Sequence, residues 1–174
     1  SEKQKRLRNV AKEQLSAIYN QVVLTVQENK TSAEVLQAIR TVFKAHEVFT
    51  FRSHNNYQYY YPVQYQYNAE CIDYKEIDGN VTAAQTAIET YLSEPFQPSE
   101  NAGVRFCFTM QDNFVKTIHI RLYSLWGDTY SALFLAERMN TLLNATENTS
   151  NDADAIPYIN YAAWQNDLIK NPED

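Results

Sequence analysis

The segment VRFCFTMQDNFVKTIHIRLY, residues 104–123, carries the clearest β-strand pattern of the sequence. Apolar and polar side chains alternate on both sides of Gln111-Asp112-Asn113, which is typical of a tight turn. The alternation predicts a β-hairpin whose returning strand has Ile118, Ile120 and Leu122 on one face, and His119, Arg121 and Tyr123 on the other. This hairpin would offer helices an apolar surface to pack on.

Strand and helix patterns alternate on either side of the hairpin. Residues 21–26 are β-branched, and Thr31 with Glu34 forms a capping-box pattern before a helix that ends at His46. Further elements are expected as a hairpin of strands at 49–52 and 57–67 around His54-Asn55-Asn56, a strand at 71–77, a helix at 84–92 and a helix at 131–143. This order predicts an α/β fold, a two-layer sandwich with a mixed β-sheet and helices on one face.

The composition is that of one globular domain. The 174 residues are 44% hydrophobic and 13% aromatic, which excludes general disorder, and no apolar run approaches the roughly 20 residues of a membrane span. A net charge of −6 argues against nucleic acid or anionic membrane as a partner. Cys71 and Cys107 have no CxxC partner or nearby histidine pair, so we expect free thiols in a reducing, cytoplasmic compartment and no metal site.

Five stretches, in order, resemble the N-terminal lobe of the condensation domains of nonribosomal peptide synthetases, relatives of chloramphenicol acetyltransferase. They are residues 35–49, 61–65, 91–108, 130–143 and PYINYAAWQ at 157–165. The resemblance implies a chloramphenicol acetyltransferase-like half-domain, with a helical extension at 1–19, a condensation-type N-lobe at 20–143, and a linker and exit segment at 144–174. That segment would lead toward a C-lobe that the sequence does not include.

The family carries a His-His-x-x-x-Asp-Gly motif between the third and the fourth of these stretches. Tyr123 and Ser124 stand at the two histidines and Asp128 stands at the aspartate, so the motif is degenerate. In the family the second histidine is held to orient or deprotonate the acceptor amine, and an unactivated serine cannot supply that base. The resemblance therefore implies a relative of the amide-forming acyltransferases that is inactive as this chain. No residue is assigned a catalytic role. The resemblance also implies a structural Asp128 paired with Arg105 or Arg121.

Other functions stay open. The same fold could be a noncatalytic docking module that binds a carrier protein or a trans-acting partner, or a divergent heterocyclisation-type domain. That subfamily has Asp-x-x-x-x-Asp-x-x-Ser here, of which Asp128 and Ser131 are kept while Tyr123 replaces the first aspartate. An unrelated α/β domain is the remaining alternative. The resemblance implies no directly bound cofactor. The partners that it implies are a carrier protein with its phosphopantetheine arm, neighbouring synthetase domains or a C-lobe, and a second copy of the chain.

Overall fold

A computed structural model describes residues 19–56, 59–64, 72–80, 82–95, 103–124 and 126–144, together with Trp164 and Asp167. The expected helix before residue 19, the Cys71 thiol and most of the linker and exit segment lie outside the described residues.

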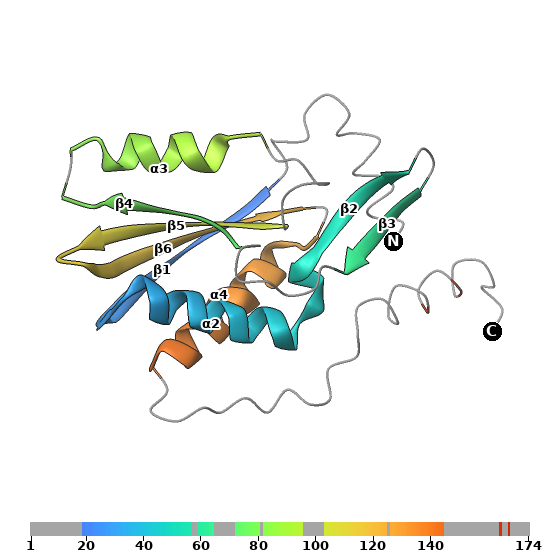
Figure 1. Cartoon of the computed structure of the whole chain (residues 1–174), viewed down its shortest axis with the longest axis horizontal. Helices are drawn as coiled ribbons and strands as arrows, with labels where there is room; N and C mark the ends of the chain where they lie inside the picture. The colour runs from blue at the N-terminus through green and yellow to red at the C-terminus, as the bar shows by residue number, and fades with distance from the viewer. Residues whose placement is uncertain are drawn as a thin grey trace.

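The main sheet has four strands in the order β1-β6-β5-β4 (Figure 1). They are β1 (Tyr19–Lys30), β4 (Asp73–Asp78), β5 (Val104–Gln111) and β6 (Phe114–Tyr123). The β1–β6 and β5–β6 pairs are antiparallel, whereas β4 and β5 are parallel and are joined through a helix, as a parallel pair requires. The predicted mixed sheet, with the 104–123 hairpin inside it, is confirmed.

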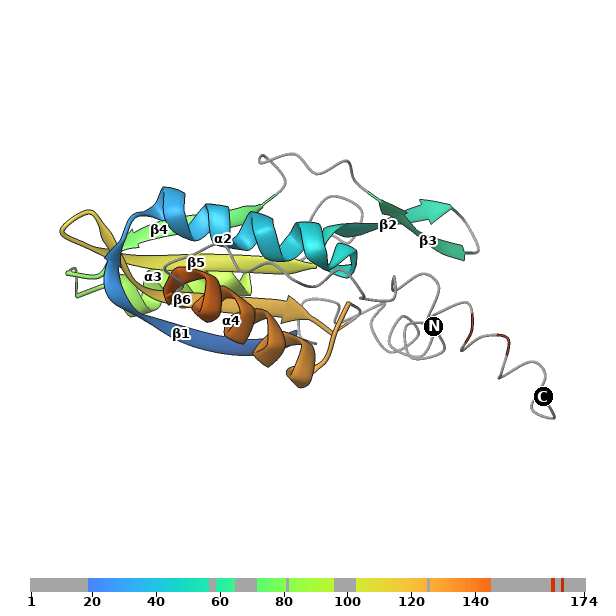
Figure 2. The ribbon, with the colours of Figure 1, turned by 90° about the horizontal axis from the view of Figure 1, so that it is seen from below.

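Helices lie on both faces of this sheet. Helices α2 (Ser32–Ala45) and α4 (Thr129–Asn144) cover one face, and α3 (Ala84–Ser93) lies on the other (Figures 1 and 2). The predicted α/β class is confirmed. The predicted placement of the helices on one face of the sheet applies to α2 and α4, and α3 lies on the other face. The reason is that β4 and β5 also present apolar groups to the other face, where Ile77 and Cys107 pack against Ile88, Tyr91 and Leu92 of α3. Burial raises the pKa of the Cys107 thiol to about 11, so this free cysteine behaves as a small apolar group.

The larger core lies between the sheet and the α2–α4 pair. Its fully buried members include Phe106, Phe108, Ile118, Ile120 and Leu122 from the sheet, and Val35, Ile39, Leu135 and Met139 from the helices. Burying an aliphatic or phenylalanine side chain contributes about 1.5–3 kcal/mol, so this face provides most of the hydrophobic stabilisation.

Local sequence signals fix the ends of the elements next to this core. Thr31 caps α2 as predicted: the Glu34 N–H donates to Thr31 Oγ1, and the Thr31 N–H donates to Glu34 Oε2 at 2.8 Å. In the β5–β6 turn, Asp112 and Asn113 both have positive φ, at 52° and 66°. Aspartate and asparagine tolerate this left-handed conformation better than other residues with a side chain, which explains the tight turn.

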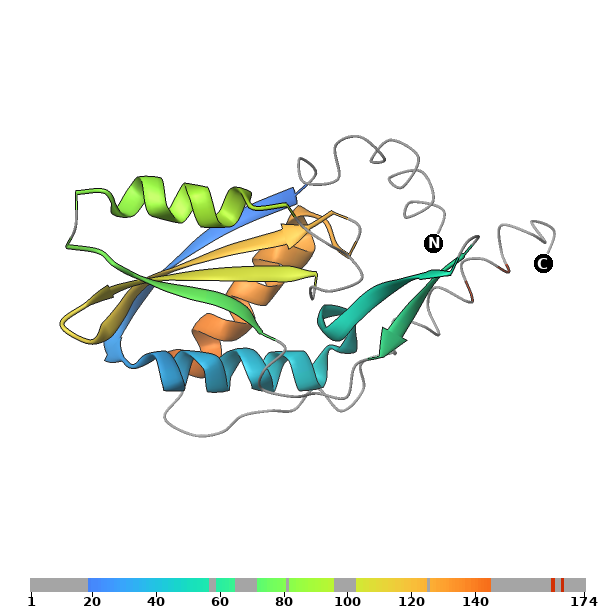
Figure 3. The same ribbon diagram turned by 45° about the horizontal axis from the view of Figure 1, so that its top comes forward.

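A second, two-stranded sheet lies beyond one end of the main sheet (Figure 3). It consists of β2 (Phe51–Asn56) and β3 (Tyr59–Gln64), preceded by the 3-10 helix η2 (Glu47–Thr50). The hairpin is confirmed, but the predicted turn at His54-Asn55-Asn56 is wrong, because these residues pair with β3 in the register His54 to Tyr61 and Asn56 to Tyr59.

The first strand of the main sheet is longer than the sequence pattern suggested. β1 continues past Val26, the last residue of the β-branched run, through Asn29 and Lys30. Its register to β6 shifts between Thr25 and Lys30, so the added residues form an irregular end of the strand. Strand pairing with β6, which the local pattern does not encode, extends the element.

Candidate functional site

The sequence places the candidate site in the turn between β6 and α4. Tyr123, at the first histidine position of the motif, is the last residue of β6 and is only 4% exposed. Its N–H donates to the Gly103 carbonyl at 2.9 Å, and its own carbonyl accepts from the Trp126 N–H at 2.9 Å. Tyr123 is therefore part of the core, and its backbone anchors the turn to the start of β5.

Ser124, at the second histidine position, is held by a residue from the other end of the chain. Asn20 of β1 donates from Nδ2 to Ser124 Oγ at 3.1 Å and to the Gly127 carbonyl at 3.3 Å. The Asn20 side-chain oxygen accepts from Thr129 Oγ1 at 2.9 Å. One amide thus connects three points of the turn, and the sequence analysis missed it. The sequence feature that could have identified it is the alternation of β1, which places Asn20 on the same half-buried face as Val22 and Leu24.

Asp128 forms the hydrogen bonds of a helix N-cap. Its Oδ1 accepts from the Ser131 N–H at 3.0 Å and from Ser131 Oγ at 2.9 Å, and its carbonyl accepts from the Ala132 N–H at 3.1 Å. A carboxylate here satisfies backbone donors that the first turn of α4 leaves unpaired, and its charge is favourable at this end of the helix. These hydrogen bonds stabilise the first turn of α4.

Close packing at two glycines fixes the path of the turn. A Cβ atom on Gly103 would lie 1.9 Å from Trp126 Cδ1, and one on Gly127 would lie 2.6 Å from Leu122 Cδ2. Trp126, 6% exposed, fills the space over Gly103. The turn accordingly needs both glycines for lack of space, and it is packed as tightly as the core.

The two arginines named as partners for Asp128 lie on the α3 face of the sheet. Arg105 Nε forms a buried ion pair with Asp73 Oδ2 at 2.8 Å, and its Nη1 donates to two carbonyls at the end of α3. Arg121 donates to the Leu92 carbonyl and, at 2.9 Å, to Gln21 Oε1. These contacts connect β4, α3 and β1, and the pairing of Asp128 with an arginine stays a prediction.

The histidine nearest to the motif in sequence lies in the middle of β6, away from the turn. His119 is paired in register with Val23 and Cys107, and its Nε2 lies 3.2 Å from Thr117 Oγ1. Burial lowers the pKa of His119, which keeps the ring neutral near pH 7. His119 does not reach Ser124, so it cannot serve as its base.

The turn can position groups by hydrogen bonding, and among the described residues no base is hydrogen-bonded to Ser124 to abstract its proton. The contact of Ser124 Oγ is the amide donor of Asn20, and Asp128 is engaged as a helix cap. Within the described ranges, no three His, Cys, Asp or Glu side chains are grouped to hold a metal ion. None of the helices described has the length and apolarity needed to cross a membrane.

Solved structures with the same arrangement of elements come from assembly-line biosynthesis. The X-domain from teicoplanin biosynthesis matches with a TM-score of 0.77 at 14% identity, over 99% of this chain and 38% of its own. The starter condensation domain of rhizomide synthetase RzmA matches with a TM-score of 0.78 at 10% identity, over 97% and 42%. The chain has the fold of a condensation-domain lobe. At these identities the likeness establishes the fold, and the lobe spans about two fifths of the length of each structure.

A third structure extends this likeness to a polyketide system. It concerns condensation domain-mediated chain release from the enacyloxin polyketide synthase, and it matches with a TM-score of 0.71 at 16% identity, over 92% of this chain and 32% of its own. No family model matches the sequence, and no curated protein matches it. The predicted resemblance to condensation-type domains is confirmed by the fold of the condensation-domain lobe.

Proposed function

We propose that the chain is the N-terminal lobe of a condensation-type domain in nonribosomal peptide or hybrid polyketide assembly, and that it is catalytically degenerate. The fold shared with synthetase and synthase structures supports the first part. The surroundings of Ser124 carry the second, because its hydroxyl contacts an amide donor and no described base is hydrogen-bonded to it. A carrier protein would present its acyl group on a phosphopantetheine arm, and a second lobe would complete the site.

An amide-formation assay tests this proposal. Two carrier proteins, each loaded with an aminoacyl thioester, are incubated with the chain, and dipeptidyl product is measured by mass spectrometry. We expect no product above the protein-free background, and no change in Ser124→Ala. A general base typically contributes about 10²–10⁴-fold, so product that falls by that factor in Ser124→Ala would show an active residue and overturn the proposal.

A noncatalytic docking function is the second candidate, because apolar side chains are exposed beside the turn. Tyr130 and Leu133, in the first turn of α4, are 83% and 50% exposed. A structure of the X-domain in complex with OxyB, also from teicoplanin biosynthesis, matches this chain with a TM-score of 0.79 at 12% identity, over 98% of this chain and 38% of its own. That complex supports protein docking by this fold, and a carrier protein on α4 would bring its arm to the turn.

Calorimetry with a phosphopantetheinylated carrier protein tests the docking function. We expect binding that is lost when Tyr130→Ala and Leu133→Ala are combined. The matched control is Tyr74→Ala, at an exposed tyrosine on the edge strand β4, which should leave binding unchanged. Equal binding by all three proteins would exclude this surface as the docking site.

A further inference from the structure

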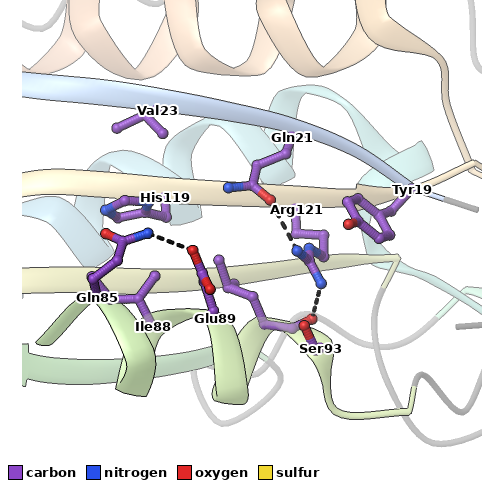
Figure 4. Close-up of a pocket in the computed structure, with 10 residues that line it drawn as sticks. Tyr19, Gln21, Val23, Gln85, Ile88, Glu89, Ser93, His119 and Arg121 are labelled. Atoms are coloured by element: carbon purple, nitrogen blue, oxygen red, sulfur yellow. Dashed lines mark hydrogen bonds between the residues drawn. The ribbon is translucent and has the colours of Figure 1, made fainter. Parts of the chain in front are cut away.

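A groove of about 400 Å³ lies on the α3 face of the sheet, away from the turn (Figure 4). Its floor is formed by β1 and β6, with Gln21, His119 and Arg121 along it, and α3 forms its wall with Gln85 and Glu89. This volume lies within the range of about 300–1,000 Å³ that small-molecule sites occupy.

Arg121 is a half-buried cation that has no carboxylate partner among the described residues. Both of its terminal nitrogens donate to neutral acceptors, the Leu92 carbonyl and Gln21 Oε1, and the ring of Tyr19 lies 3.6 Å from the guanidinium carbon. In the described part of the chain no Asp or Glu is within ion-pair distance of it, and the ionisable groups that act on it are the Tyr19 hydroxyl and a second cation, Arg105. Buried charges in proteins are normally paired, so this guanidinium has unused capacity for an anion.

Two buried polar atoms beside the groove also have no partner. Arg121 Nε and His119 Nδ1 are each shielded from water and lack a hydrogen bond among the described residues. Such atoms are rare in folded proteins, and each one costs free energy unless a ligand or an ordered water satisfies it. Both atoms lie below the accessible surface, so they are an uncompensated cost of the polar face and not contacts for a ligand in the groove.

The opposite wall supplies the opposite charge. Glu89 is exposed on α3 at the groove, where its Oε1 accepts from Gln85 Nε2 at 2.7 Å, which leaves its second oxygen to accept from a ligand. Val23, Ile88 and Leu92 add apolar lining to the same groove. The groove thus has a cation on its floor, an anion on its wall and apolar side chains beside them.

We propose that this groove binds a small zwitterion, an α-amino acid with an apolar side chain. The carboxylate would contact Arg121 beneath Tyr19, the ammonium group would contact Glu89, and the side chain would cover Val23, Ile88 and Leu92. The inference does not depend on the function proposed for the turn, because the groove lining includes none of the motif positions Tyr123, Ser124 and Asp128.

Binding of three related ligands to the 174-residue chain tests this inference, with calorimetry as the readout. The ligands are L-leucine, L-leucinamide, which lacks the carboxylate, and N-acetyl-L-leucine, which lacks the ammonium group. Losing one charge-assisted hydrogen bond costs about 1.5–3 kcal/mol, so leucine should bind about tenfold or more tightly than either analogue. Equal affinity for the three ligands, or no binding of leucine, would overturn the proposal.

Variants of the two charged residues assign the contacts. Arg121→Gln should remove the preference for leucine over leucinamide, and Glu89→Gln should remove the preference over N-acetyl-leucine. The matched controls are Arg138→Gln and Glu137→Gln on α4, across the sheet, which should leave both preferences unchanged. If Arg121→Gln does not fold, as judged by circular dichroism, Arg121→Lys keeps the charge and should bind leucine more weakly than wild type. Preferences that survive in both groove variants would place the amino acid elsewhere.

Discussion

Strands β5 and β6 present very different faces to the two helical layers. Toward α2 and α4 their side chains are apolar and fully buried, among them Phe106, Phe108, Ile118 and Ile120. Toward α3 the same strands carry polar side chains, each of which forms a hydrogen bond with another of them or with a neighbouring element: Arg105, Thr109, Thr117, His119 and Arg121. The apolar face is stabilised by packing, whereas the polar face depends on specific partners. Side-chain contributions should therefore be large and general on the first face, and smaller and tied to individual contacts on the second.

The largest effect is expected from Phe106→Ala, which empties the middle of the apolar face. Truncating a buried phenylalanine costs about 3–5 kcal/mol of unfolding free energy, because it loses burial and leaves a cavity. Phe106 is 0% exposed. Urea unfolding followed by circular dichroism measures the change. Tyr130→Ala, at an aromatic residue that is 83% exposed, is the control and should change stability by less than about 0.5 kcal/mol. Similar losses in the two variants would contradict the assigned core.

The next largest effect is expected at the ion pair of the polar face. Asp73 accepts from Arg105 Nε at 2.8 Å and from the Tyr91 hydroxyl at 2.6 Å. Asp73→Ala removes the acceptor of both hydrogen bonds, and the arginine side chain is only 5% exposed. We expect a loss of about 2 kcal/mol, below the value for a fully buried pair because the Asp73 side chain is 20% exposed.

A surface ion pair provides the comparison for Asp73. Glu28 contacts Lys30 Nζ at 2.9 Å, and the Glu28 side chain is 63% exposed. Glu28→Ala should cost no more than about 1 kcal/mol, since solvent screens exposed pairs. If Glu28→Ala and Asp73→Ala have equal effects in urea unfolding, the polar face gains nothing from burial of its ion pair.

A smaller effect is expected from Asn20→Ala, at the polar exception on the α4 side of β1. Its three hydrogen bonds join Ser124, Gly127 and Thr129 to the strand. Partly exposed neutral hydrogen bonds contribute little each, so we expect a loss of about 1–2 kcal/mol in urea unfolding. Asn29→Ala, at an exposed asparagine of the same strand, should have almost no effect. A null result at Asn20 would mean that the turn holds its shape without this residue.

The smallest effect is a pH dependence from His119. Burial lowers its pKa in the folded state below the ordinary 6.5, so the unfolded chain binds more protons below pH 6.5. The ring therefore costs nothing well above pH 6.5, and it lowers stability progressively as the pH falls through 6.5 toward the folded pKa. Urea midpoints measured across this range should fall less steeply in His119→Gln than in wild type. Parallel curves would show that His119 does not contribute.

The sequence predicted the elements whose local pattern is complete. The 104–123 hairpin alternates along its whole length, and Thr31 and Glu34 mark the start of α2 by themselves. The position of α3 could not be predicted in this way. It depends on the parallel pairing of β4 with β5, and neither strand encodes its partner. Cys107, predicted as a free thiol, is buried against α3 for this reason.

The candidate site was predicted in position but not in its contacts. The motif comparison located Tyr123, Ser124 and Asp128 at the turn, which the structure places between β6 and α4. The contribution of Asn20 follows from the register of β1 on β6, in which Asn20 lies opposite Leu122. The local sequence pattern of the turn does not indicate a contact with a residue so far away along the chain. Its role emerges only from the assembled sheet.

The hydrogen bonds from Asn20 to the turn also affect the order in which parts of the lobe fold. Asn20 and Ser124 are 104 positions apart in the sequence. β1 enters the main sheet only when it pairs with β6, which lies much later in the chain. Contacts of such long sequence separation close large loops and form slowly. During synthesis on the ribosome, Asn20 emerges long before Ser124, and the hydrogen bond between them can form only after β6 has emerged and paired with β1. The geometry of the turn would thus be among the last parts of the lobe to mature.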